Sequence, residues 1–442
     1  MTRGIPIALY GDAVPSCKDQ SFLSMSWESL TVGDDTRPRD RIQYIGGYYV
    51  HTDVTNAGAA TTSQCWWPPV VSSLLNAEAG VFPDDDLGRG GQEVAGGYYL
   101  VVMAVKGDYE FKMNYMGLPG HWSSAYPCCD CLATLAEGPM NFRNTKHDAP
   151  WKERTFAKLG HAEWVAHCGR LGKVPALPFQ PRGRGGLGLT HHFNFQDMLH
   201  CWDLGITQHI LGNTLWHLVF TDVMGPGSAK HKFDEVATMI NDEYRKRDTS
   251  SQFTNLDMAM FCDCEHPQAT FPYLKGKAGN TRHLAPILRD IWCKVASKEV
   301  AYEQHICRVL TNLCVVYASV GERDASGDRY FTYPVAVSDA IISAIDKLCL
   351  HYAFLCKTCA DMSPARLLWN MPPKFHHGLH SGQQSRWATF RSTWTYNNED
   401  FMAHVQVLGE AHRHSLKAAH RSAKMAECYL LGRSLRMHIT AL

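Results

Sequence analysis

The hydrophobic pattern divides the chain into an early part that predicts strands and a later part that predicts helices. In the early part, short apolar or alternating runs end at glycines or polar turns. The segments that predict strands are residues 5–12 (IPIALYGD), 21–32 (SFLSMSWESLTV), 41–51 (RIQYIGGYYVH) and 98–108 (YYLVVMAVKGD). The glycine pair at 46–47 indicates a β-bulge in the third of them.

From residue 194 onward, apolar side chains recur at helical spacing. Leu199, Trp202, Ile206 and Ile210 form one such stripe. Further helical patterns cover residues 283–296, 304–320, 338–356 and 396–416, and a short one follows the tryptophan pair at 66–67. Between the strands and the helices, residues 117–190 are rich in turns, cysteine, histidine and basic residues. Strands come first, then this insert, then helices, so the chain is expected to contain both α and β structure.

Composition narrows the class of protein. The chain has 442 residues, of which 45% are apolar and 19% charged, which is typical of a folded protein with a core. Its 43 basic and 43 acidic residues balance, so any DNA contact must come from local basic patches. The first residues carry no signal-peptide pattern, and no apolar run is long enough for a membrane span. We expect an intracellular protein whose 16 cysteines are reduced or bind metal.

Two aspartates follow strands in matching contexts. Asp12 ends LYGD and Asp108 ends VKGD. If the two strands are neighbours in one sheet, both carboxylates project from the same edge, where a divalent cation would offset their repulsion. This predicts a Mg²⁺ site for phosphoryl transfer, although Gly-Asp after a strand is also ordinary turn chemistry. Glu399 is a candidate third acid at the start of a long helix, where it would also complement the helix dipole.

The segment YPCCDC contains a Cys-x-x-Cys pair, Cys128 and Cys131, whose spacing suits one tetrahedral zinc ion. Cys129 would then point elsewhere, and the remaining ligands would be histidine or aspartate. Asp197 and His200 are three residues apart and would share a helix face. His147, His191 and His192 are alternatives, and the thiols could also be ordinary core residues.

Two weaker signals complete the inventory. The histidine-rich segment PPKFHHGLHSG, with His376, His377 and His380, could bind a metal or contact phosphates. The basic loop QPRGRGG, residues 180–186, could touch a DNA backbone. A chance cluster is a real alternative for the first, because the chain has 23 histidines.

The order of these motifs resembles the catalytic region of eukaryotic cut-and-paste DNA transposases of the CACTA (En/Spm) and Plavaka groups. The similar stretches are IALYGDAVPSCKDQSFLSMSWESLTV, VVMAVKGDYEFKMNYMGLPGHWSSAYPCCDC, FQDMLHCWDLGITQHILGNTLWHLV, and PPKFHHGLHSG followed by WTYNNEDFM. Together they span most of residues 4–430. Cys129 stands where the family often has proline.

The resemblance implies an RNase H-like core, a mixed sheet flanked by helices, with a Cys/His-containing insert and a large helical insertion. The implied segments are residues 1–116 (first part of the core), 117–193 (Cys/His-rich insert), 194–225 (core helix), 226–370 (helical insertion) and 371–442 (last part of the core). Asp12, Asp108 and Glu399 would form a DDE triad that binds Mg²⁺ or Mn²⁺, with Asp400 as an alternative third acid. Cys128, Cys131, Asp197 and His200 would match the family's Cys-x-x-Cys and Asp-x-x-His signatures, with zinc as the metal.

The implied function is DNA strand cleavage and strand transfer in the nucleus, on transposon ends and target DNA, by a homo-oligomer with no membrane partner. Two other classes of function stay open at this point. One is a transposase-derived protein that binds DNA or protein without catalysis. The other is an unrelated zinc-dependent hydrolase that uses the histidine clusters.

Overall fold

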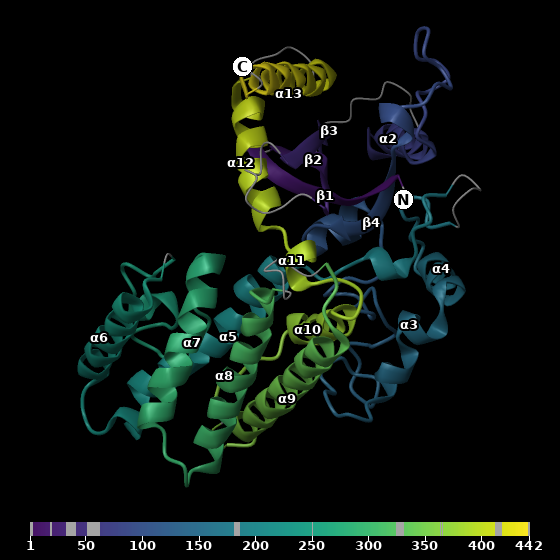
Figure 1. Cartoon of the computed structure of the whole chain (residues 1–442). Coiled ribbons are helices and arrows are strands. Elements are labelled where there is room, and N and C mark those ends of the chain that lie inside the picture. Colours follow the sequence, from purple (N-terminus) through teal and green to yellow (C-terminus); the bar gives the residue numbers. More distant parts are fainter. Residues whose placement is uncertain are drawn as a thin grey trace. The chain divides into compact units, whose positions relative to one another are not determined.

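The computed structural model describes residues 3–17, 20–31, 41–50, 62–180, 186–249, 251–323, 331–362, 364, 366–411 and 418–440. Within these, the chain forms two compact units (Figure 1). The sheet unit comprises Met1–Gly120, Phe156–Phe195 and Thr393–Leu442, and the helical unit comprises His121–Thr155 and Gln196–Ser392. Most of the basic loop 180–186 lies outside the described residues.

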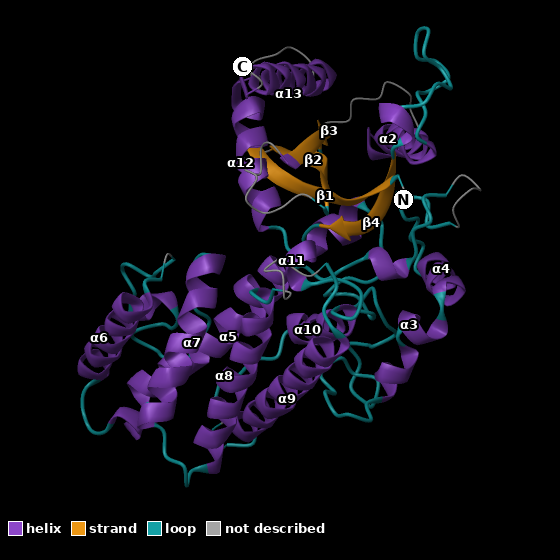
Figure 2. Ribbon diagram, viewed as in Figure 1, coloured by secondary structure: helices purple, strands orange, loops and turns teal. Residues whose placement is uncertain are grey.

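The sheet unit is built on four strands in the order β3-β2-β1-β4 (Figure 2). They are β1 Gly4–Cys17, β2 Gln20–Ser29, β3 Ile42–Tyr49 and β4 Tyr99–Lys106. β2 pairs antiparallel with β1 and with β3, whereas β4 runs parallel to β1. The register between β2 and β3 shifts beside Gly46, which confirms the predicted bulge.

Helices cover both faces of this sheet. α12 (Tyr396–Ala411) and α13 (Ala418–Thr440) pack on one face through a core that joins the two helices to β2 and β3. Its members are Phe22, Ile42, Tyr49, Phe401, Val405, Met425 and Tyr429. Tyr48 points to the opposite face, because side chains alternate along a strand, and its ring lies 5.5 Å from that of Trp66 on α2 (Thr62–Ala79). The sheet is therefore the middle layer of an α/β unit.

The rest of the sheet unit comes from the middle of the chain. α3 (Phe156–Leu159) and α4 (His161–Arg170) precede a single bridge in which Asn194 pairs parallel with Val105 on β4. A short π-helix, Phe111–Tyr115, follows β4. Asn194 therefore extends the sheet beyond β4 by one residue pair.

The helical unit consists of helices and of the cysteine-bearing loops at residues 121–155. Its helices are the π-helix Met198–Ile206, α5 Thr207–Phe220, α6 Ala229–Arg247, α7 Ala278–Val295, α8 Ala301–Val320, α9 Val335–Ala360 and α10 Pro373–Gln384. α11 (Phe390–Thr393) leads back to the sheet unit. Almost every side chain of α5 is buried, because α6, α7 and α8 all pack against it. The unit is a helical bundle around α5.

These two units group the chain differently from the predicted segments. Residues 121–155 of the predicted insert 117–193 belong with the helical unit, whereas residues 156–195 belong with the sheet unit. α10 lies in the helical unit, although it falls in the segment 371–442 that we predicted as core. α10 packs on α9 and on the π-helix Met198–Ile206 of the helical unit.

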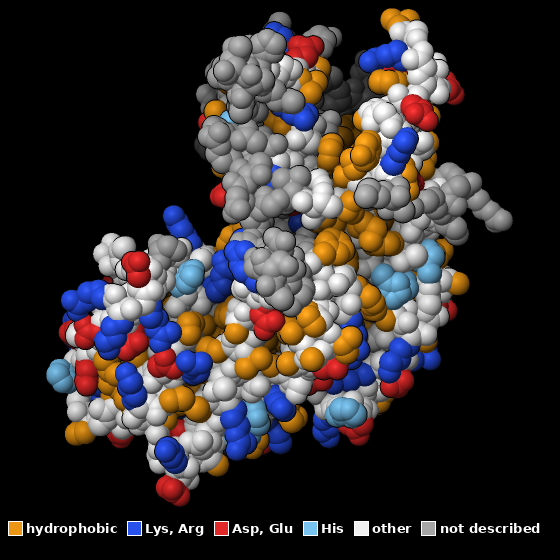
Figure 3. All heavy atoms as spheres, in the orientation of Figure 1, with side chains coloured by type: hydrophobic (Ala, Val, Ile, Leu, Met, Phe, Trp, Pro, Cys, Tyr) orange, Lys and Arg blue, Asp and Glu red, His pale blue; other side chains and the backbone are white. Residues whose placement is uncertain are grey.

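Among the described residues, no helix is long and apolar enough to cross a membrane. Charges of both signs are mixed over α6 and α7 (Figure 3). Arg245 pairs with Asp242, and Arg247 pairs with Glu243 and Asp290. This part of the surface therefore has no strip of a single charge sign, consistent with the balanced composition.

Candidate acidic site and metal centre

Asp12 and Asp108 lie at the same end of adjacent parallel strands. Tyr10 on β1 is directly opposite Lys106 on β4, and each aspartate stands two residues further along. Asp12 is within β1, and Asp108 follows the last residue of β4. The adjacency on which the acidic-site hypothesis depends is therefore present.

The glycine before each aspartate makes room for one aromatic ring. A Cβ on Gly11 would lie 2.2 Å from the Phe111 ring, and a Cβ on Gly107 would lie 2.5 Å from the same ring and 2.7 Å from the Gly11 carbonyl oxygen. Gly107 also has φ +142°, which other residues rarely adopt. Asp108 Oδ1 accepts a hydrogen bond of 2.6 Å from the Phe111 N–H and so fixes the turn. The Gly-Asp motif thus lets β1 and β4 approach over Phe111.

Glu399 reaches the same site from α12. The Tyr10 hydroxyl lies 3.2 Å from Asp12 Oδ2 and 3.1 Å from Glu399 Oε1, so the two carboxylates share one phenol donor. Since both oxygens are within 3.2 Å of one atom, they approach each other to less than twice that distance. Asp400, the alternative third acid, is exposed. The side chain that meets β1 is therefore that of Glu399.

The site is acidic and partly open to solvent. Asp12, Asp108 and Glu399 are each half-buried, and Asp12 Oδ1 also accepts a 2.7 Å bond from the Ala13 N–H. Burial, and then nearby acidic groups that include Asp108 and Asp12, raise the pKa of Tyr115. The Tyr115 hydroxyl therefore lies within electrostatic range of both Asp108 and Asp12. Carboxylates so close are the ligand type that Mg²⁺ and Mn²⁺ prefer.

A second cluster forms the candidate metal centre of the helical unit. The ligand atoms of Cys128, Cys131, His376 and His380 all lie within 4.8 Å of one another, and all four residues are buried. Cys131 Sγ and His380 Nε2 are each 3.1 Å from His376 Nε2. This buried Cys2His2 group can bind a metal ion such as zinc. In the described residues it is the only set of three or more ligand atoms this close, so the three acids are more widely spaced.

Backbone hydrogen bonds and helix spacing place the four side chains of this group. The Asp130 N–H donates to Cys128 Sγ at 3.3 Å, and the Ala133 N–H donates to Cys131 Sγ at 3.4 Å. Such bonds stabilise thiolates. On α10, His376 and His380 are four residues apart and so share one helix face.

Aromatic and histidine neighbours enclose the centre. Trp151 packs on His376 with ring centroids 4.3 Å apart. His377 faces away from the ligand group and lies 3.3 Å from the Pro127 carbonyl oxygen through Nε2. Burial, and then His376 and His380, lower the pKa of His377 to about 3, so this ring is neutral and donates its Nε2–H to Pro127. It links α10 to the Cys-x-x-Cys loop.

The two thiols of this group differ in pKa. Burial, and then hydrogen bonding with Cys131, raise the pKa of Cys128 well above its usual range. Burial would also raise the pKa of Cys131, but the Cys128 hydrogen bond and the charges of His376 and His380 outweigh it and hold that pKa well below its usual range. Two neighbouring thiolates need a cation, because one negative charge discourages the second.

Asp197 and His200 do not take part in this centre. Asp197 stands just before the π-helix Met198–Ile206, where it accepts hydrogen bonds from the Leu199 and His200 N–H groups, and its Oδ2 lies 2.5 Å from His200 Nδ1. We predicted that the pair would share a helix face as zinc ligands. Instead Asp197 caps the helix, because a carboxylate at that position satisfies unpaired N–H groups. His147, His191 and His192 also lie outside the group, as does Cys129.

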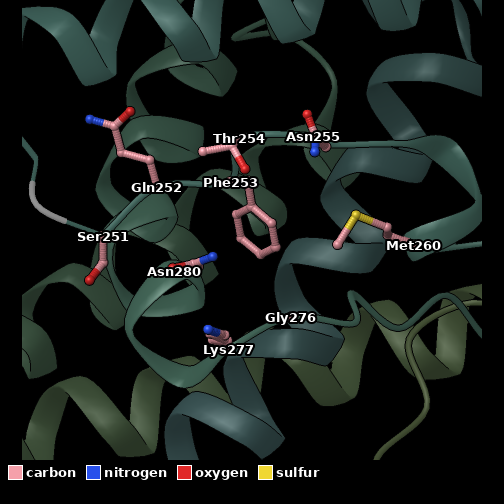
Figure 4. A pocket seen from close by; sticks show the side chains of 9 residues that line it. All are labelled: Ser251, Gln252, Phe253, Thr254, Asn255, Met260, Gly276, Lys277 and Asn280. Atoms are coloured by element: carbon pink, nitrogen blue, oxygen red, sulfur yellow. The ribbon is translucent and has the colours of Figure 1, made fainter.

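A separate pocket of about 690 Å³ lies in the helical unit at the start of α7 (Figure 4). None of the predicted site residues contributes to it. Its lining combines the Phe253 ring and Met260 with polar side chains; the full set is Ser251, Gln252, Phe253, Thr254, Asn255, Met260, Gly276, Lys277 and Asn280. The candidate chemistry therefore lies elsewhere.

Comparison of the sequence with protein-family models gives no match, and comparison with curated proteins also gives none. The geometry therefore carries the functional argument. Four buried protein ligands leave no open coordination position, which is typical of structural rather than catalytic zinc.

Sequence reasoning missed two features of these sites. Tyr10 joins Asp12 to Glu399, and its position two residues before Asp12 on the same strand face is a signal that strand alternation offers. His376 and His380 complete the Cys-x-x-Cys pair. Their i, i+4 spacing is a recognisable ligand pattern, but their separation from Cys131 by 245 residues hides the partnership.

Proposed function

We propose that this chain is the catalytic region of a DNA transposase-like protein with an RNase H-like core. The observation that carries the proposal is that three acids distant in sequence lie on neighbouring elements of the sheet unit. Asp12 and Asp108 each stand two residues beyond the last paired residues of the adjacent parallel strands β1 and β4, and Glu399 shares the Tyr10 hydroxyl with Asp12. The resemblance to CACTA-like and Plavaka-like transposases assigns the same three residues to a DDE triad.

The residues fit the chemistry of phosphoryl transfer. Asp12, Asp108 and Glu399 would hold Mg²⁺ or Mn²⁺, which activates the attacking hydroxyl and stabilises the leaving oxygen. Water is the nucleophile in strand cleavage, and a DNA 3′-hydroxyl is the nucleophile in strand transfer. Tyr10 orients two of the carboxylates, and the half-buried position of the acids leaves their oxygens accessible to a DNA backbone. The partners would be transposon ends and target DNA, bound by a homo-oligomer in the nucleus.

The Cys2His2 group has a supporting part in this proposal. It ties α10 to the Cys-x-x-Cys loop within the helical unit and supplies no open metal position for hydrolysis. A zinc-dependent hydrolase that uses His376, His377 and His380 is therefore not supported. A transposase-derived binding protein remains the competing outcome of the experiment.

The test combines metal binding with DNA nicking, using the full zinc-loaded chain. We expect Mn²⁺ to bind, as measured by electron paramagnetic resonance of free Mn²⁺, and supercoiled plasmid to be nicked in Mn²⁺. Asp108→Asn should slow nicking by about 10²-fold or more, because the metals supply several kcal/mol of transition-state stabilisation.

Asp400→Asn is the matched control, since Asp400 is exposed and adjacent to Glu399. It should leave both metal binding and nicking unchanged. Equal nicking by the wild type and Asp108→Asn would overturn the triad. If the chain binds plasmid but does not nick it, and if Asp108→Asn does not change Mn²⁺ binding, the result would favour a transposase-derived protein that binds DNA without catalysis.

A further inference from the structure

A buried cluster of charges lies on the sheet beside the three acids. Lys106, the last residue of β4, is 2% exposed, and its Nζ lies 2.6 Å from Glu28 Oε1 on β2. Glu28 Oε2 lies 2.8 Å from Arg41 Nη2 at the start of β3. The side chains of Glu28 and Arg41 are 3% and 6% exposed. All three charges are therefore removed from water and depend on one another.

The ion pair between Lys106 and Glu28 crosses over β1, the strand that carries Asp12. Ala8 on β1 is directly opposite Glu28, and Tyr10 is directly opposite Lys106. Residues in register share one face, so the cluster lies on the same face as Tyr10 and Asp12. The small side chain of Ala8 leaves space for Lys106 and Glu28 to meet. The cluster thus links β4, β2 and the residue that precedes β3, across β1, on the face that carries Asp12.

Lys106 also contacts the chain that enters α12. Its Nζ lies 3.5 Å from the carbonyl oxygen of Trp394, two residues before α12 begins at Tyr396. α12 carries Glu399, and Lys106 itself is two residues before Asp108. The ammonium group of Lys106 therefore contacts β2 and the residues that precede α12, and the backbone of Lys106 continues to Asp108.

Stability alone is a weak explanation for such a cluster. Moving charges out of water costs several kcal/mol per ion, and well-packed apolar residues often replace buried ion pairs without loss. A buried charge does, however, require its partners to stay at hydrogen-bond distance, and this restricts the positions of the elements that carry them. The cluster is suited to fixing geometry.

We propose that Lys106 is a positioning residue for the acidic site: through Glu28 and the Trp394 carbonyl it fixes Asp108 relative to Glu399 and so determines the affinity for divalent cations. This inference rests on the proposed function, because it assumes that the three acids bind metal. Lys106 acts through backbone position and touches neither metal nor DNA.

The decisive measurement is the Mn²⁺ dissociation constant of the zinc-loaded full chain, with Asp12→Asn as the blank that identifies the acidic site. Lys106→Met removes the ammonium group but keeps an apolar chain of similar length, and it leaves Glu28 paired with Arg41. We expect Mn²⁺ binding to weaken about 10- to 100-fold, the effect typical of losing an outer partner of a metal ligand. Glu28→Gln is a second variant that keeps the side-chain shape but removes the counter-charge of both Lys106 and Arg41, and it should weaken binding in the same direction.

Lys232→Met is the matched control. Lys232 is a buried lysine of the helical unit, with Nζ 2.7 Å from the Thr221 carbonyl oxygen, and it has no link to the acids. Its loss should lower the melting temperature without changing Mn²⁺ affinity. Unchanged Mn²⁺ affinity in Lys106→Met, or in Glu28→Gln if the first variant does not fold, would overturn the positioning role while the proposed function stands. If the wild type shows no Mn²⁺ binding that Asp12→Asn removes, the proposed function fails and the inference fails with it.

Discussion

The two candidate metal sites differ in how the fold brings their side chains together and in how deeply these side chains are buried. At the acidic site, regular strand register places Asp12 and Asp108 on adjacent strands, and Asp12 shares one phenol with Glu399 while all three acids stay half-buried. At the Cys2His2 centre, loop residues meet a helix face, and every ligand is buried. The first arrangement leaves carboxylate oxygens partly exposed, whereas the second encloses its ligand atoms. Under the proposed function, the exposure of the ligands separates a site for chemistry from a site for stability.

The sharpest way to break this comparison is to remove a ligand from the buried centre. Cys131→Ser should cost the chain its zinc and several kcal/mol of stability, because metal-binding free energy in such a site is also folding free energy. Zinc content by elemental analysis and the unfolding transition of the helical unit would check it. Cys129→Ser, an adjacent buried thiol outside the group, should keep the zinc.

If Cys131→Ser kept a full equivalent of zinc, the Cys2His2 assignment would be wrong. If instead the zinc were lost and the helical unit melted unchanged, the centre would not have the stabilising role that its burial indicates.

The parts of these two sites that could be predicted from sequence are those that depend on residues close together in the chain. The adjacency of Asp12 and Asp108 could be predicted from sequence because each aspartate carries a local signature, a Gly-Asp pair in or after an apolar strand, and their strands are neighbours. Glu399 could be proposed but not separated from Asp400, since helix periodicity does not show which of two neighbouring acids meets Tyr10. The link between residues at 10 and 399 is a tertiary contact.

The Cys2His2 group was less predictable from sequence than the two aspartates. Cys128 and Cys131 have a local spacing that predicts half a site, but the second half lies on α10. Asp197 and His200 were the nearer candidates in sequence, yet a helix N-terminus uses Asp197 first. The placement of α10 in the helical unit likewise depends on tertiary contacts, with α9 and the π-helix Met198–Ile206. Strand segments were predicted well because alternation and glycine-ended runs are local properties.

A smaller effect tests how the strands support the acidic site. Gly11→Ala places a Cβ 2.2 Å from the Phe111 ring, and overpacking of this kind costs about 1–3 kcal/mol. We expect a lower free energy of unfolding for the sheet unit, measured by denaturant titration, and weaker Mn²⁺ binding because β1 must move relative to β4. Gly409→Ala is the control: its Cβ would lie 3.5 Å from Met425, an ordinary contact on α12. If Gly11→Ala were as stable as Gly409→Ala, the close packing of both glycines on Phe111 would not constrain the site.

An effect of similar size concerns the phenol that Asp12 and Glu399 share. Tyr10→Phe removes the hydroxyl between Asp12 and Glu399, and a buried hydrogen bond to a charged group contributes about 1.5–3 kcal/mol. Without that donor, the repulsion between the two carboxylates is larger, and a bound cation offsets more of it. The variant should therefore melt lower in chelator, yet gain more in melting temperature from added Mn²⁺ than the wild type does. Tyr429→Phe is the matched control, because its buried hydroxyl donates to the Ile42 carbonyl at 2.8 Å, away from the acids. It should lower the melting temperature equally with and without Mn²⁺; an equal Mn²⁺ response in both variants would show that Tyr10 supports the fold alone and that the acids do not act as one charged site.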